Sequence, residues 1–186
     1  MAVPLDDVTR AAVAATALEL RERAGRLPVS WVAPENFHVT LKFLGGIDEA
    51  RLPFIVTALQ ASSAWHAPFP VDIRGLGAFP SATRARVLWA GVGDGGEALG
   101  ALAGSVDEGL AKIGFPAEDR PFSAHVTIGR VRMPGRAPEL TAALMGAAAR
   151  PFGRVDVHAI LLMRSDLSSR GARYTVLARV PLTGQP

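Results

Sequence analysis

The sequence predicts an α+β fold with antiparallel sheets, on the basis of three observations. Segments with the apolar period of helices alternate with strand-like runs of period two. Several of these runs are joined by connections too short for the crossovers that parallel strands require. Finally, His38-Val39-Thr40-Leu41 returns 87 positions later as His125-Val126-Thr127-Ile128, which suggests two related halves of about 90 residues.

In the first half, a helix capped by Asp6 or Asp7 is expected to run to about residue 23. A second helix is expected from Asp48 to about residue 62, with Pro53 tolerated in its first turn. The buried stripe of the first helix is expected to comprise Val8, Ala12, Ala15 and Leu18 with the neighbouring aliphatic residues. The strands expected here span residues 30–33, 37–44 and 69–76.

The second half is expected to repeat this mixture of helices and strands. Its strands are predicted at residues 84–92, 122–131, 155–163 and 173–180, the last two antiparallel across a turn at 166–171, and its helices at 97–113 and 138–150. No low-complexity linker divides the chain, so residues 1–186 are expected to form a single domain made of two lobes.

The composition is that of an ordinary folded protein, with 49% apolar and 20% charged residues. No apolar run approaches 18 residues, so we expect no membrane span. The N-terminus lacks a basic segment followed by a long apolar one, and cysteine is absent, which excludes disulfides and thiolate metal sites. A cytoplasmic location follows as the expectation.

The charge is mildly basic. A net charge of +3 fits a protein that contacts a few phosphates better than one that coats a duplex. A GC-rich genome would equally account for most of the arginines.

Alternation along a strand places His38 and Thr40 on one face, and His125 and Thr127 on one face of the later strand. Lys42 is expected on the face of His38. The opposite faces are expected to enter the core through Phe37, Val39, Leu41 and Phe43, and through Phe122, Ala124, Val126 and Ile128. If the two polar faces line one cleft, the site contains two histidines and two threonines.

Paired imidazoles can run acid–base chemistry at phosphorus without a metal. A neutral imidazole takes a proton from the attacking water, an imidazolium gives one to the departing alkoxide, and threonine hydroxyls donate to the non-bridging oxygens. Either histidine alone would equally suit packing at a strand end, and it is the matched pair that favours catalysis. A metal site explains the two motifs less well, because neither motif has a second ligand nearby. No cofactor is expected.

Further segments carry a family resemblance. The sequences ENFHVTLKFLG, RVLW and PFSAHVTIGR, followed by SDL leading through Gly171 to Tyr174, stand at residues 35–45, 86–89, 121–130 and 165–174. With these segments the chain resembles the 2H phosphoesterase superfamily, and within it the bacterial and archaeal RNA 2′,3′-cyclic phosphodiesterases, historically called 2′-5′ RNA ligases.

The resemblance implies a bilobal, pseudo-symmetric fold in which antiparallel sheets line a central groove, helices lie outside, and each lobe supplies one motif. It implies metal-independent hydrolysis of an RNA or nucleoside 2′,3′-cyclic phosphate to a 2′-phosphomonoester. By the same resemblance, His38 is the proton donor and His125 the proton acceptor. The chemistry of their hydroxyls makes Thr40 and Thr127 the candidates for binding the phosphate. The two motifs are too similar for the sequence alone to assign the donor and the acceptor.

The resemblance also implies that Arg130 binds phosphate. Strict alternation would put Arg130 on the core face, so either a bulge, such as one at Gly129, redirects it, or it lies past the end of the strand. Phe43 and Phe79 are candidates for stacking on a base, although core packing is the more natural role for Phe43.

Two other functions fit the same residues. One is the joining of RNA ends through a 2′-5′ bond, which is the reverse reaction, and the other is a non-catalytic module that binds RNA ends. The expected partners are RNA ends or nucleotides with a 2′,3′-cyclic phosphate, without a membrane, and the protein is expected to be a monomer.

Overall fold

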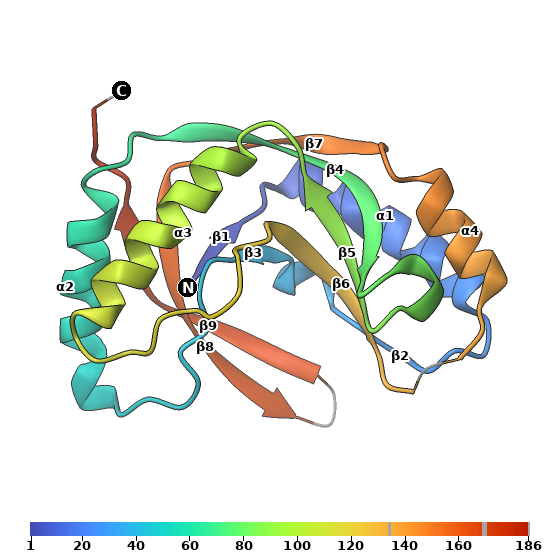
Figure 1. Ribbon diagram of the computed structural model, residues 1–186, viewed down its shortest axis with the longest axis horizontal. Helices are drawn as coiled ribbons and strands as arrows, with labels where there is room; N and C mark the ends of the chain where they lie inside the picture. The colour runs from blue at the N-terminus through green and yellow to red at the C-terminus, as the bar shows by residue number, and fades with distance from the viewer. Residues whose placement is uncertain (134, 169–170, 186) are drawn as a thin grey trace.

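The structure is a computed structural model that describes residues 1–133, 135–168 and 171–185. Within these residues, nine strands form one antiparallel sheet in the order β7-β4-β5-β6-β3-β1-β8-β9, with β2 beside β6 (Figure 1). The strands are β1 (Ala2–Pro4), β2 (Val29–Trp31), β3 (His38–Thr40), β4 (Phe69–Phe79), β5 (Val87–Val92), β6 (His125–Val131), β7 (Pro151–Val157), β8 (Ala159–Ser168) and β9 (Gly171–Pro181). The α+β prediction is confirmed.

Helices gather at the two ends of the molecule, with α2 and α3 at one end and α1 and α4 at the other (Figure 1). The helices are α1 (Asp7–Ala24), α2 (Leu52–Ser63), α3 (Gly96–Ala111) and α4 (Pro138–Gly146), with short 3-10 turns η1 (Pro34–Asn36), η2 (Glu49–Arg51) and η3 (Ala82–Arg84). Because α2 packs on α3 and α1 on α4, each pair joins a helix of the first half to one of the second.

The sheet has a pseudo-twofold arrangement about the seam between β3 and β6. Moving outward from the seam, β3, β1, β8 and β9 occupy the places that β6, β5, β4 and β7 occupy on the other side. A shift of 87 positions along the chain carries β1 onto β5, α1 onto α3, β3 onto β6 and α2 onto α4. The repeat of the short motif therefore extends to whole elements.

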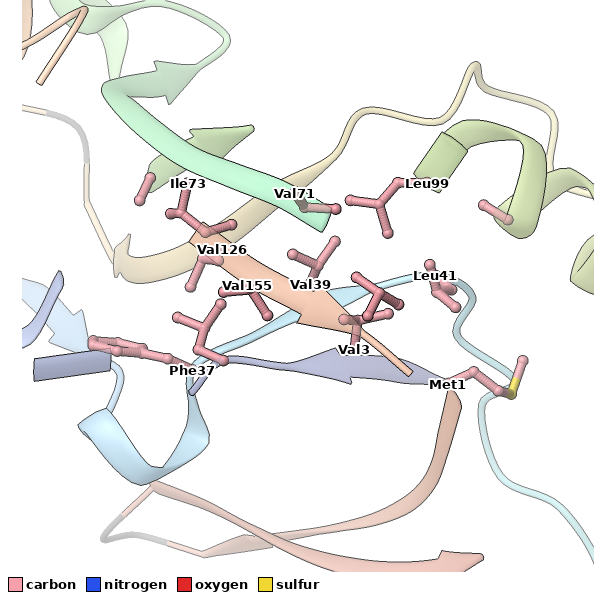
Figure 2. Packing of buried hydrophobic residues seen from close by; sticks show 14 of the residues in the cluster. Met1, Val3, Phe37, Val39, Leu41, Val71, Ile73, Leu99, Val126 and Val155 are labelled. Carbon is pink, nitrogen blue, oxygen red and sulfur yellow. The ribbon is translucent and has the colours of Figure 1, made fainter. Parts of the chain in front are cut away.

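The core is shared by the two halves. Val39 and Val126 pair across β3 and β6 at the seam and are 1% and 0% exposed. Around them, apolar side chains from β1, β4, β7 and α3 converge (Figure 2). Among the residues described, no helix is both long and apolar enough to cross a membrane.

Helix α1 begins and ends where the sequence predicts, but its buried face is different. Asp6 caps it by accepting hydrogen bonds from the Thr9 amide (2.9 Å) and hydroxyl (2.8 Å). Because the cap satisfies the Thr9 hydroxyl, this side chain can be buried, at 1% exposure. The predicted stripe was wrong, since Val8 and Leu18 are 78% and 63% exposed. The buried residues are Thr9, Val13, Thr16, Leu20 and Ala24.

Several strand boundaries also differ from prediction. Residues 155–163, predicted as one strand, belong to two strands that separate at His158, because β7 pairs with β4 whereas β8 pairs with β1 and β9. In the predicted turn at 166–171, strand β8 continues to Ser168 and β9 begins at Gly171. Residues 169–170 lie outside the described residues. Strand β3 stops at Thr40, four residues earlier than predicted.

Candidate active site

The two histidine motifs meet where β3 and β6 pair. The antiparallel register aligns Val39 with Val126, so His38 lies opposite Thr127, and Thr40 lies opposite His125. Since both valines face the core, the four polar side chains share the other face of the sheet. Diagonal neighbours in such a pair lie about 7–8 Å apart, which is the separation expected for the two histidines.

Both imidazoles are oriented by the same local hydrogen bond. Nδ1 of His38 lies 2.8 Å from the carbonyl oxygen of Asn36, and Nδ1 of His125 lies 2.7 Å from that of Ser123. A carbonyl oxygen only accepts, so Nδ1 carries a hydrogen in both rings. The Nε2 atom of each ring is therefore the one that can exchange a proton.

An aromatic ring also packs edge-on against each imidazole. The ring of Tyr174 on β9 lies 5.0 Å from that of His38, and the ring of Phe79 on β4 lies 5.1 Å from that of His125, both centroid to centroid. These contacts restrict rotation of the two histidine rings. In the sequence, Tyr174 stands at the end of a resembling segment, where no local pattern indicates this role.

Burial changes the electrostatic surroundings of His38. Burial lowers the pKa of His38 below its ordinary value of 6.5. Near neutral pH the free protein therefore carries His38 mainly in its neutral form.

Over the described parts of the chain, no three metal-ligating side chains of the His, Cys, Asp or Glu types are grouped together.

A bulge in β6 decides the position of Arg130. The register between β5 and β6 aligns Trp89 with Thr127 but Leu88 with Gly129, so Ile128 is an extra residue on β6. Arg130 then pairs with Val87, which in turn pairs with Phe79. Because the ring of Phe79 touches His125, Arg130 lies on the same face as the motifs. Of the two explanations that the sequence allowed, the structure therefore shows the bulge, with Ile128, one position before Gly129, as the extra residue.

Lys42 was predicted on the polar face, and this was wrong. Beyond the end of β3 the alternation no longer holds, and the Lys42 side chain turns inward to 2% exposure. Its ammonium forms an ion pair with Asp107 of α3 and donates a hydrogen bond of 2.7 Å to the Pro116 carbonyl. The neighbouring Phe43 is 73% exposed, so core packing of Phe43 was also wrong.

The ion pair ties the first motif to the segment that precedes the second. Asp107 also accepts a hydrogen bond of 3.2 Å from the Glu118 amide, and the bond from Lys42 holds the pKa of Asp107 below its usual range. Residues 112–124, which lead into His125, are thereby attached to the end of the His38 motif.

A cavity of about 550 Å³ adjoins His38. It lies between η1, the start of the chain and the hairpin formed by β8 and β9. Its lining includes Leu5, His38, Met163, Arg173, Tyr174 and Val176. The other two histidines lie outside this site: His66 bonds the Ser105 hydroxyl (2.9 Å), and His158 is exposed.

Known proteins are similar to this chain in both sequence and fold. The family described as LigT like Phosphoesterase matches residues 3–89 and 92–174, and each range contains one histidine motif. RNA 2′,3′-cyclic phosphodiesterases from Archaeoglobus fulgidus and Aquifex aeolicus are 38% and 40% identical to the chain. These matches cover 94% of this chain and 94% of the first relative, and 83% of this chain and 82% of the second.

Two solved structures extend this similarity to the fold. A crystal structure of a Thermus thermophilus protein aligns with a TM-score of 0.82 at 30% identity, over 100% of this chain and 97% of the other. E. coli LigT complexed with 3′-AMP aligns with a TM-score of 0.71 at 26% identity, over 98% and 95%. The chain belongs to the LigT-like phosphoesterase family.

Proposed function

We propose that the protein is an RNA 2′,3′-cyclic phosphodiesterase that hydrolyses a terminal cyclic phosphate to a 2′-phosphomonoester without a metal. The observation that carries the proposal is the pair of imidazoles on one sheet face, each with Nδ1 engaged and Nε2 available. The names of the relatives support the same activity, and E. coli LigT has been crystallised with 3′-AMP and with phosphate.

In the proposed mechanism, Nε2 of His125 accepts a proton from water as the water oxygen attacks phosphorus. Nε2 of His38 gives a proton to the 3′-oxygen as its bond to phosphorus breaks. The hydroxyls of Thr40 and Thr127 and the guanidinium of Arg130 stabilise the charge on the non-bridging oxygens. Each threonine lies across from the histidine of the other motif, so both halves contact the phosphoryl group from opposite sides.

The donor role requires that His38 gain a proton before the chemical step. Burial lowers its pKa in the free protein, and a phosphodiester anion bound beside the ring acts in the opposite direction. Substrate binding is therefore expected to charge the donor. One histidine must be protonated and the other neutral, so the rate should depend on pH as a bell-shaped curve.

The proposal is tested by incubating 2′,3′-cyclic AMP with the protein in the presence of EDTA and identifying the phosphomonoester. We expect 2′-AMP. His38→Ala and His125→Ala should each lower kcat by about 10²–10⁴-fold, the usual contribution of a general acid or base. His158→Ala, which removes an exposed histidine elsewhere, is the matched control. Near wild-type turnover in either motif variant, with native circular dichroism, would contradict the proposal.

Other outcomes would favour the alternative functions. Ligation would be the main activity if an RNA with a 5′-hydroxyl were joined to a cyclic-phosphate end at a rate that rivals hydrolysis. Tight binding of the cyclic nucleotide without hydrolysis over hours would indicate a binding module.

We infer further that residues 1–186 form one domain in which each lobe supplies one motif. The single sheet and the shared core support this inference. The monomeric state and the cytoplasmic location stay predictions, and light scattering after size-exclusion chromatography tests the first.

A further inference from the structure

The ring that contacts His125 is itself supported by a second aromatic side chain. Phe79, the last residue of β4, packs against the indole of Trp89 on β5, with 5.3 Å between the ring centroids and 39° between the ring planes. Its other ring contact is the edge-on one with His125, at 5.1 Å and 83°. Phe79 thus contacts both the indole and the imidazole, so a displacement of the indole reaches His125 through this one ring.

The indole fits on the sheet because two neighbouring residues lack side chains. The register places Trp89 opposite Gly77 of β4, and an added Cβ at Gly77 would overlap the Cζ2 and Cη2 atoms of Trp89. At Gly91, two positions along β5 on the same face, an added Cβ would fall 3.0 Å from Trp89 Cζ3 and 2.9 Å from the Arg74 carbonyl oxygen. Glycine inside a strand weakens the strand and often marks the close approach of another group, which here is the indole.

Packing, and not a hydrogen bond, determines where the indole lies. Its Nε1–H is buried, and over the described part of the chain it has no hydrogen-bond partner. An unpaired buried donor is unfavourable, and in a folded protein it calls for an explanation. A role of Trp89 in supporting Phe79 supplies that explanation.

The ring contact of the other histidine is independent of Trp89. The partner of His38 is Tyr174 on β9. In the sheet, β9 and β5 lie on opposite sides of the seam between β3 and β6. A change at Trp89 should therefore affect the ring of His125 and leave that of His38 as a control within the same molecule.

We propose that Trp89 is a positioning residue for the base of the reaction and acts on His125 through Phe79. The inference rests on the proposed function, in which Nε2 of His125 takes a proton from the attacking water. Held between Phe79 and the Ser123 carbonyl, the imidazole keeps Nε2 directed at that water. An imidazole that could rotate would be correctly oriented only part of the time, so loss of the support should lower kcat and leave KM nearly unchanged.

Gly77→Ala tests the inference by placing a methyl group where the indole lies. With 2′,3′-cyclic AMP as the substrate, kcat should fall by about 10–100-fold at unchanged KM, as expected when a catalytic group is displaced by about 1 Å. Gly100→Ala is the matched control, because an added Cβ at this glycine of α3 lies in open space. It should keep the wild-type kcat.

A compensating variant distinguishes positioning from general damage to the fold. Trp89→Phe removes Cζ2 and Cη2, the two atoms that the new methyl group would overlap, and leaves a ring on which Phe79 can pack. It also removes the unpaired Nε1–H, so no hydrogen bond is lost. In the Gly77→Ala background, Trp89→Phe should therefore restore most of the lost kcat.

Phe79→Leu tests the ring contact itself and does not depend on whether Gly77→Ala folds. It should lower kcat about tenfold without a change in KM. Long-range proton–nitrogen correlation spectra, recorded where both imidazoles are neutral, should show a single Nδ1–H tautomer for His38 and for His125 in the wild type. In Phe79→Leu, His125 should show a mixture of tautomers while His38 keeps one.

The inference is overturned if Phe79→Leu keeps either the wild-type kcat or a single tautomer of His125. It is also overturned if the loss in Phe79→Leu is confined to KM, because Phe79 then contacts the bound nucleotide, or if Trp89→Phe does not raise the kcat of folded Gly77→Ala. In all these results the wild type remains active and the proposed function stands. A wild type that does not hydrolyse cyclic AMP contradicts the proposed function itself, and the inference falls with it.

Discussion

At the scale of single residues, the site is built from two copies of one local arrangement. In each, a backbone carbonyl two positions before the histidine accepts the Nδ1 hydrogen, and an aromatic ring packs against the imidazole edge-on. The tautomer is thus determined by the backbone and needs no carboxylate partner. This differs from catalytic triads, in which an acidic side chain orients the histidine.

The lowered pKa of His38 can be measured directly. Because burial disfavours the imidazolium, nuclear magnetic resonance titration of the free protein should place the His38 pKa below 6.5, and added inorganic phosphate should raise it. The unfolded chain binds this proton more tightly than the folded one, so the free energy of unfolding should decrease as the pH falls from 6.5 through the folded-state pKa. A His38 pKa above 6.5 in the free protein would contradict the account.

Sequence periodicity identified the residues of the site better than it identified their neighbours. His38 and Thr40 could be placed on one face because β3 is regular as far as Thr40. Lys42 and Phe43 could not, because the strand ends there and the direction of each side chain depends on tertiary partners. The partner of Lys42, Asp107, lies 65 positions away, and nothing in the local pattern indicates it.

At the scale of elements, the buried ion pair between Lys42 and Asp107 should matter more than an exposed one. Asp107→Ala leaves the Lys42 ammonium, at 2% exposure, with only the more distant carboxylate of Glu118 at 3.8 Å. It should lower the free energy of unfolding by about 3 kcal/mol, the lower end of the range for breaking a buried ion pair. Glu19→Ala removes a comparable carboxylate from Arg150, but both partners of that pair are largely exposed, so the loss should be about 0–1 kcal/mol.

Urea denaturation of the two variants measures the difference. Equal midpoints would show that the Lys42 ion pair has no special structural role. A lowered midpoint in Asp107→Ala together with reduced turnover in the folded protein would indicate that the attached segment 112–124 also positions His125.

The ends of helices were predicted reliably where a capping residue or a glycine marks them in the sequence. Asp6 and Gly25 mark both ends of α1, and Asp48 caps the turn η2 that leads into α2. The break at His158 has no such signal, since the chain continues as a strand and only changes its neighbours. Which face of α1 is buried could not be predicted either, because its alanine-rich surface offers several apolar stripes. The Asp6 cap selects the face that contains Thr9.

At the scale of the whole molecule, the basic charge is concentrated near the site. Residues 79–92 and 125–138, which contain β5 and β6, hold five arginines and no acidic residue. The exposed members lie at the end of the sheet that carries Arg130, where the Val131 amide bonds the Arg86 carbonyl at 2.9 Å. A cluster of positive charges attracts anions over a distance set by the ionic strength.

The rate should therefore depend on salt. For a single-stranded RNA with a 2′,3′-cyclic end, kcat/KM should decrease as sodium chloride increases, and a variant with Arg86→Ala and Arg132→Ala should show a shallower slope, by about 0.7 per lost phosphate contact. Arg21→Ala, which removes an exposed arginine on α1, is the control. An unchanged slope in the double variant would show that these two arginines take no part in binding RNA.

The extra residue at Ile128 breaks the symmetry of the two halves. In a regular strand, positions at even intervals share a face, yet Arg130 stands five positions after His125 and still reaches the shared face. In the first half, Lys42 stands at an even interval from His38 and turns away. Two identical halves would let a phosphodiester be rotated end over end at no energetic cost. Under the proposal that Arg130 binds the phosphate, a guanidinium comes from only one of the two motif strands and the two orientations become unequal. A single inserted residue would then make a duplicated scaffold directional.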